Sequence, residues 1–166
     1  TRIRTRRRLA DEDLQADKAD DVSTWSSLDT ERPWTVNAER RWHYHKRAQM
    51  VRDARQRWAY LWKLSRVPKL NRIDIEVEPL IVSWKSAPDV AACAGTVKAA
   101  IDALVDVGKI PDDSAAHLRS VRFWAPAVGD VEGLRITVRE VVYDGKPETD
   151  EAPEDIAPTT FRGDVA

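Results

Sequence analysis

A pair of adjacent aspartates, with a lysine on the segment before them, is the group of residues in this sequence most suited to chemistry. Asp112 and Asp113 follow Pro111, and Lys98 lies fifteen residues before Asp113. Adjacent carboxylates repel each other unless a cation or hydrogen-bond donors lie between them, so the pair is a candidate for a compact acidic site. A solvated polar turn is the alternative, since Pro, Asp and Ser are ordinary turn residues.

A helix predicted from Val97 onward positions Lys98 beside this turn. Its apolar residues recur at helical spacing and predict one buried stripe, made of Val97, Ala100, Ile101, Leu104 and Val105. Lys98, Asp102 and Asp106 fall on the adjoining face, where Asp102 has a structural role, either as the i+4 partner of Lys98 or as a support of the turn. Gly108 then ends the helix, because glycine readily adopts the left-handed conformation found at helix C-termini.

Residues 98–114 resemble the core signature of the RusA family of Holliday junction resolvases. The family pattern is a helix of the form Lys-x-x-x-Asp-x-Leu, a glycine, a few apolar residues and then Asp-Asp. The residues that match it by type and spacing are Lys98, Asp102, Leu104, Gly108, Asp112 and Asp113. The family's Pro-Trp pair with a following asparagine is matched by Pro33, Trp34 and Asn37, and the order of elements extends the resemblance to about Val142.

The resemblance implies a fold, an activity and a set of site residues. The expected fold is α+β, a small mixed sheet with two main helices, in a homodimer whose two-fold axis suits paired cuts in a four-way junction. The implied activity is Mg²⁺-dependent endonucleolytic resolution of Holliday junctions or other branched DNA, with Mn²⁺ as an alternative metal, in recombination and repair of phage or prophage type. The implied catalytic residues are Asp113, Asp112, Lys98 and Asp89, and the three aspartates are the implied metal ligands.

One motif of the family is absent from the matching positions. The family has Asp-x-Asp six and four residues before the helical lysine, where this sequence has Ala92 and Ala94. The nearest upstream carboxylate is Asp89, which either enters the site by a different loop path or is an ordinary turn or helix-start residue. Two functions therefore stay open: the endonuclease, and a catalytically inactive RusA-fold protein that binds DNA. No phosphate-binding glycine motif, Ser/His/Asp spacing or cysteine cluster indicates another enzyme class.

A strongly basic segment precedes these motifs. Residues 32–72 contain twelve lysines and arginines and only two acidic residues, although the whole chain has a net charge of −1. A polyanion responds to such local charge. The residues expected to contact DNA are Arg40, Arg41, Trp42, Lys46, Arg47, Arg52 and Arg55. Cations of the predicted loop 37–47 would bind phosphates while Trp42 or Tyr44 stacks on an unpaired base; the alternatives are an exposed amphipathic loop and a surface for an acidic protein.

The remaining patterns predict the elements of a small α+β domain. A long helix is expected over 45–65, with Trp58 and Trp62 on its buried stripe. Pro79 is expected to bend the chain between two strands. The strands are expected at 73–77, 80–84, 118–124 and 134–142, and a strand or extended entry is expected at 33–36.

Three regions are expected along the chain: a mobile N-terminal arm at 1–30, a RusA-like nuclease domain at 31–142 and a disordered acidic tail at 143–166. The basic head of the arm either touches DNA phosphates or is simply solvated. No apolar run is long enough to span a membrane and no secretion signal is evident, so we expect a cytoplasmic protein, in a bacterial host cell if a phage encodes it. The single cysteine, Cys93, excludes an intramolecular disulfide.

Overall fold

Nine helical and strand segments make up the part of the chain that the structure, a computed structural model, describes, residues 23–142. In chain order they are β1 (Thr24–Asp29), α1 (Val36–Glu39), α2 (Tyr44–Leu64), β2 (Ile73–Ile81), the 3-10 turn η1 (Trp84–Ser86), α3 (Ala94–Asp106), β3 (Leu118–Phe123), β4 (Ala127–Val128) and β5 (Gly133–Glu140). The fold is mixed α+β with a small mixed sheet, and this part of the fold prediction is confirmed.

Strands β5 and β2 form the centre of the sheet. The strand order is β1-β5-β2-β3, and β4 pairs with the far end of β2. β5 runs antiparallel to both β1 and β2, whereas β3 and β4 run parallel to β2. Parallel neighbours need a crossover connection, and α3 lies in the connection between β2 and β3.

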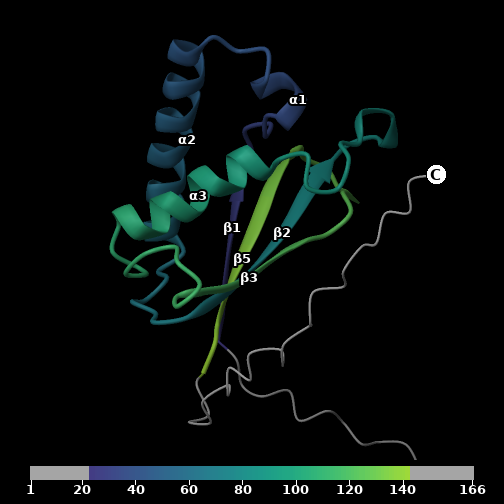
Figure 1. Cartoon of the computed structure of the whole chain (residues 1–166). Coiled ribbons are helices and arrows are strands. Elements are labelled where there is room, and N and C mark those ends of the chain that lie inside the picture. The colour runs from purple at the N-terminus through teal and green to yellow at the C-terminus, as the bar shows by residue number, and fades with distance from the viewer. Residues whose placement is uncertain (1–22, 143–166) are drawn as a thin grey trace, which may run out of the picture.

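The apolar core lies between one face of the sheet and the helices α2 and α3. Side chains alternate between the two faces of a strand, and the residues of β2 and β5 on the covered face are buried: Ile73, Ile75, Val77, Leu134, Ile136 and Val138. Trp58 and Trp62 of α2 belong to the same core and are fully buried, as expected. Figure 1 shows α3 crossing in front of the strands, with α2 beside it.

The opposite face of the sheet carries cross-strand ion pairs. Glu78 lies opposite Arg135, with 2.6 Å between Oε2 and Nη1. Asp74 is buried, and it accepts hydrogen bonds from Arg119 Nε at 3.0 Å and from Ser120 Oγ at 2.7 Å. The hydrogen bond from Arg119 is the main cause that holds the pKa of Asp74 below its ordinary value. Asp74 is therefore charged at neutral pH and anchors β3 to β2.

Helix α2 and strands β3 and β5 confirm the elements expected at 45–65, 118–124 and 134–142, within two residues at each end. Gly108 has a φ of +66°, so it supplies the left-handed residue that was expected after α3.

Of the two alternatives for residues 33–36, a strand or an extended entry, the structure has the extended entry: Thr35 is extended and caps α1, which begins at Val36. The bend expected at Pro79 is wrong. Pro79 does not end its strand, since β2 continues to Ile81. On one side of β2 the pairing with β3 stops at Val77 and that with β4 starts at Leu80. Pro79 falls in this gap, where the missing N–H of proline removes no hydrogen bond of the ladder.

The folded domain begins before residue 31. β1 lies within the region expected to be a mobile arm, yet it pairs with β5 along its whole length. Its Ser27 is buried and donates a hydrogen bond to the carbonyl oxygen of Leu61 at 3.4 Å. The rest of the expected arm and the expected acidic tail lie outside the described residues. Within 23–142 no helix is both long and apolar enough to cross a lipid bilayer.

Replacing Asp74 with Asn is expected to lower the free energy of unfolding by about 2 kcal/mol at pH 7. The variant loses the charged carboxylate that accepts the hydrogen bonds of Arg119 and Ser120. The folded-state pKa of Asp74 is lowered, so its contribution is present above the unfolded-state pKa and is lost as the pH falls through the folded-state pKa. The difference between wild type and variant should therefore begin to shrink below about pH 4 and be smaller at pH 3 than at pH 7. Urea titrations at pH 7 and pH 3 measure this, with the exposed Asp130→Asn as control; an equal difference at both pH values would contradict it.

Candidate nucleic-acid interface and acidic cluster

Helix α3 positions the candidate catalytic lysine. Most of its surface is buried, and the buried residues are Thr96, Val97, Ala99, Ala100, Ile101, Ala103 and Leu104. The small side chains of its alanines allow α2 to approach, and Trp62 Nε1 donates a hydrogen bond to the carbonyl oxygen of Ala100 at 3.0 Å. The remaining stripe of α3 carries Lys98, Asp102 and Asp106, one helical turn apart.

Lys98 joins two carboxylates. Its Nζ donates hydrogen bonds to Asp102 Oδ1 at 2.6 Å and to Asp113 Oδ2. Asp102 and then Asp113 raise the pKa of Lys98. In return, the hydrogen bond from Lys98 lowers the pKa of Asp113. Lys98 and Asp113 are therefore both charged at neutral pH, and the structure brings these two ends of the sequence motif into direct contact.

Arg55 connects this cluster to α2. Its guanidinium donates to Asp106, with Nη2 2.7 Å from Oδ1 and Nε 3.0 Å from Oδ2, and its Nη1 lies 3.6 Å from Asp102 Oδ2. The hydrogen bond to Asp106 is the main cause that raises the pKa of Arg55. Arg55 was expected to contact DNA, but its charge is already compensated by two aspartates. Its principal contact is the ion pair with Asp106, which joins α2 to α3.

Asp112 and Asp89 do not join the cluster around Lys98. Asp112 Oδ1 accepts a hydrogen bond from the backbone N–H of Ser114 at 2.8 Å, which is the contact of an ordinary aspartate turn. Hydrogen bonds from Ser114 lower the pKa of Asp112. Asp89 is exposed ahead of α3, and its carbonyl oxygen accepts the N–H of Ala92 at 3.0 Å. Both residues thus occupy turns.

The donor set does not fit the expected divalent metal. Among residues 23–142 no group of three or more histidine, cysteine, aspartate or glutamate side chains is placed so that it could hold a metal ion. Asp89, Asp112 and Asp113 were the expected ligands, and they do not form such a group. Two carboxylates do converge, but the ammonium group of Lys98 lies between them. A lysine therefore supplies the positive charge that relieves their repulsion.

Ala92 and Ala94, at the positions where the RusA pattern has aspartates, lie at the start of α3. Ala94 is the first residue of α3, one turn before Lys98 on the same stripe. The carbonyl oxygen of Ala92 accepts a hydrogen bond from Val36 N at 2.8 Å and so ties the start of α3 to α1.

Two surface hollows near these residues share part of their lining and are together called the basic path. The first, here called the α2 groove, has a volume of about 740 Å³ and is lined by Val51, Arg52, Arg55, Ala59 and Asp106, among others. The second, the α1 pocket, has a volume of about 570 Å³ and is lined by Glu39, Arg40, Trp42 and Gly95, among others. Tyr44 and Arg47 line both hollows. The path therefore runs from α1 along the outer flank of α2.

The cations of this path differ in how far they are neutralised. Arg47 Nε donates to Glu39 Oε1 at 2.5 Å, and Lys46 Nζ lies 5.3 Å from the centroid of the Trp42 ring. Arg40 and Arg52 are exposed, and within residues 23–142 neither forms an ion pair. The start of α2 thus presents positive charge that the described residues leave uncompensated, which is what an anionic ligand requires.

The acidic cluster borders the same path. Gly95 of α3 lines the α1 pocket and Asp106 lines the α2 groove. Lys98 and Asp102 lie between these two residues along the same face of α3. Lys98 and Asp102 are therefore at the edge of the basic path.

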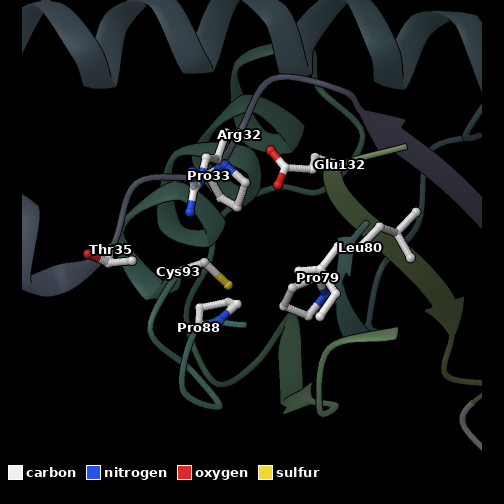
Figure 2. A pocket seen from close by; sticks show the side chains of 10 residues that line it. Arg32, Pro33, Thr35, Pro79, Leu80, Pro88, Cys93 and Glu132 are labelled. Carbon is white, nitrogen blue, oxygen red and sulfur yellow. The ribbon is translucent and has the colours of Figure 1, made fainter. Parts of the chain in front are cut away.

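A third hollow lies elsewhere, near the start of α3, and is too small for a substrate. Figure 2 shows its lining, where Cys93 faces the rings of Pro79 and Pro88. Its volume is about 40 Å³, enough for a few water molecules. Burial raises the pKa of the Cys93 thiol to about 11, so this cysteine is protonated at neutral pH and is a poor nucleophile.

Sequence reasoning missed the residues that shape the α1 pocket. Glu39 accepts a hydrogen bond from Trp34 Nε1 at 3.1 Å in addition to that from Arg47. Gly95 makes room for these contacts, because a Cβ at this position would overlap Glu39 Oε2 and lie 2.7 Å from Trp34 Nε1. The one sequence signal that could have indicated this pocket is Glu39 itself, a single glutamate within the basic segment 32–72.

Comparison with known proteins finds no model of a protein family and no curated protein that matches this chain.

Replacing Lys98 with Met is expected to raise the pKa of Asp113 toward or above its ordinary value, because the ammonium that lowers it is lost and Asp102 remains nearby. Carbon-detected NMR titration of the aspartate carboxylates measures this pKa. Unfolding free energy should change by less than about 1 kcal/mol, since the pair is largely exposed. Lys85→Met, on the exposed η1 turn, is the control. An unchanged pKa of Asp113 would show that the contact with Lys98 does not form in solution.

Proposed function

We propose that this protein binds branched DNA in the manner of a RusA-like protein, using the α2 groove and the α1 pocket. The observation that carries the proposal is that the two hollows adjoin, with Tyr44 and Arg47 in the lining of both. A polynucleotide needs such an extended path, with cations for the phosphates and aromatic rings for the bases.

The arrangement of free and compensated charge supports a nucleic-acid ligand. Arg55 and Arg57 are engaged by Asp106 and by Asp29, so their charge serves the fold. Arg40 and Arg52 keep their charge available beside the path. A ligand with a phosphate every few ångströms gains from several such cations at once, because each phosphate that is neutralised releases condensed counterions.

The branched form of the DNA and the homodimer come from the sequence resemblance. A four-way junction has two-fold symmetry, and a two-fold dimer presents two copies of one basic path to it. The proposed setting is DNA recombination or repair in the cytoplasm of a bacterial cell, with phage or prophage as the source. Tyr44 is exposed and can stack on a base. The bases of a continuous duplex are already stacked on one another, so this ring favours DNA with unpaired or unstacked bases.

Replacing Arg52 with Gln is expected to weaken binding of a synthetic four-way junction about fivefold and to reduce the slope of log K against log salt by about 0.9, the value for one lost phosphate contact. Fluorescence anisotropy over a salt series measures both quantities. Lys63→Gln is the matched control, since Lys63 is exposed on the last turn of α2 and lines neither hollow. Absence of junction binding by wild type would refute the proposal, and equal losses in the two variants would move the interface away from the groove.

Cleavage of the bound DNA is a second candidate function. The observation in its favour is the contact between Lys98 and Asp113 at the edge of the basic path. There Lys98 would stabilise a scissile phosphate or the leaving oxygen. Asp112, Asp113 and Asp89 remain the proposed acids for cleavage with Mg²⁺ or Mn²⁺. Because the donor set of residues 23–142 does not fit the metal, binding without cleavage is the function that the geometry supports better.

We expect the wild-type protein to bind a four-way junction without cutting it in Mg²⁺ or Mn²⁺. The Ala92→Asp, Ala94→Asp double variant should gain metal-dependent nicking, because it restores two carboxylates beside Lys98. Denaturing gels of end-labelled junctions score the products, and adding Asp113→Asn to the double variant should remove the gain. Paired, metal-dependent nicks by wild type that disappear in Asp113→Asn would instead establish the endonuclease.

A further inference from the structure

The α1 pocket contains a fixed carboxylate next to open aromatic rings. The Glu39 side chain is 15% exposed, and both of its oxygens are held, Oε2 by Trp34 Nε1 and Oε1 by Arg47 Nε. Gly95 packs against the Glu39 carboxylate, where a Cβ atom would overlap Oε2. Each carboxylate oxygen has a second acceptor position, so Glu39 can accept two further hydrogen bonds without losing its present partners.

Aromatic side chains also line the pocket. The Tyr44 side chain lines both hollows, and the residue is 67% exposed. Trp42 is held in place by Trp34, with ring centroids 5.8 Å apart, and by Lys46. The Tyr44 ring already contacts the rings of His45 and His43, with centroids 3.7 Å and 4.5 Å away. Because the residue is still 67% exposed, a planar group that enters the pocket can stack on its remaining surface, which is how proteins hold single bases.

We propose that the α1 pocket holds one unpaired base of the bound DNA, and that Glu39 selects guanine. Guanine presents two parallel donors on its Watson–Crick edge, N1–H and N2–H, which match the two oxygens of a carboxylate. Adenine and cytosine present one amino group beside an acceptor, and thymine presents one N–H between two carbonyl oxygens. A carboxylate is repelled by such acceptors.

Only a base outside the duplex offers this edge, because pairing uses the same atoms. Arg40 at the rim of the pocket and Arg47 at its junction with the α2 groove are placed for the flanking phosphates. The pocket thus identifies the structural element that the protein recognises at a branch point: an extruded guanine with its backbone on the basic path. This inference rests on the proposed DNA binding and adds base selectivity to it.

The test uses DNA duplexes that carry a single central bulged nucleotide, which is G, T or an abasic residue, together with the fully paired duplex. Anisotropy at one fixed salt concentration gives the four dissociation constants for the full-length protein. The G bulge should bind about tenfold more tightly than the T bulge or the abasic bulge. Glu39→Gln should bring the G and T bulges within about twofold of each other, since one acceptor is exchanged for a donor.

A matched pair of tyrosines separates stacking from general effects. Tyr44→Ala should weaken binding of the G bulge about tenfold more than it weakens binding of the paired duplex. Tyr60→Ala should change neither, since Tyr60 is similarly exposed on α2, at 63%, but lines neither hollow. Adding free dGMP as competitor distinguishes a mononucleotide site from a DNA site: displacement of the bulged DNA at micromolar dGMP would overturn the role of the flanking phosphates.

The failures of the two proposals are distinguishable. Equal binding of the G, T and abasic bulges, with salt-sensitive binding of all of them, would overturn the base pocket and leave DNA binding intact. A wild-type preference for G that persists in Glu39→Gln would overturn the role of the carboxylate. No binding of any of these DNAs would overturn both.

Discussion

The close packing of α3 against α2 decides where the charged residues of the candidate site lie. Ala99, Ala100 and Ala103 are buried with almost no exposed surface, and they leave room for the two large rings of Trp58 and Trp62. A larger side chain at any of these alanines would overfill the interface. Because α3 is covered on its other sides, one stripe alone is left for polar residues. That stripe holds Lys98 and its partners.

The same packing separates two kinds of positive charge. Near the interface, arginine guanidinium groups from α2 are matched by aspartates of α3 and β1, and these pairs fix the helix orientations. At the start of α2, away from the interface, the cations exceed the acids. Net charge hides this division, because the acidic residues of the chain lie largely in other segments. A surface for a polyanion and a nearly neutral chain are thus compatible.

The sequence was sufficient for the features that depend on local spacing. The buried stripe of α2, the stop at Gly108 and the alternation in β5 follow from periodicity and from backbone preference, and each is found. Strand β1 was not predictable, because its buried Ser27 and Asp29 are polar and find partners such as Leu61 and Arg57 of α2 only in the folded structure. The contact of Lys98 with Asp113 followed from the motif, whereas the role of Glu39 depends on Trp34 and Gly95, which meet it only in three dimensions.

Strand β1, the first element of the described fold, pairs only with β5, the last, with Thr24 opposite Arg139. During synthesis β1 leaves the ribosome long before its partner exists, and the cost of closing so long a loop delays the pairing further. The helices and β2 can therefore collapse first, with one sheet edge vacant, while β5 is still being made. The hydroxyl-rich sequence of β1, with its two serines and a threonine, suits a strand that must wait in water without aggregating.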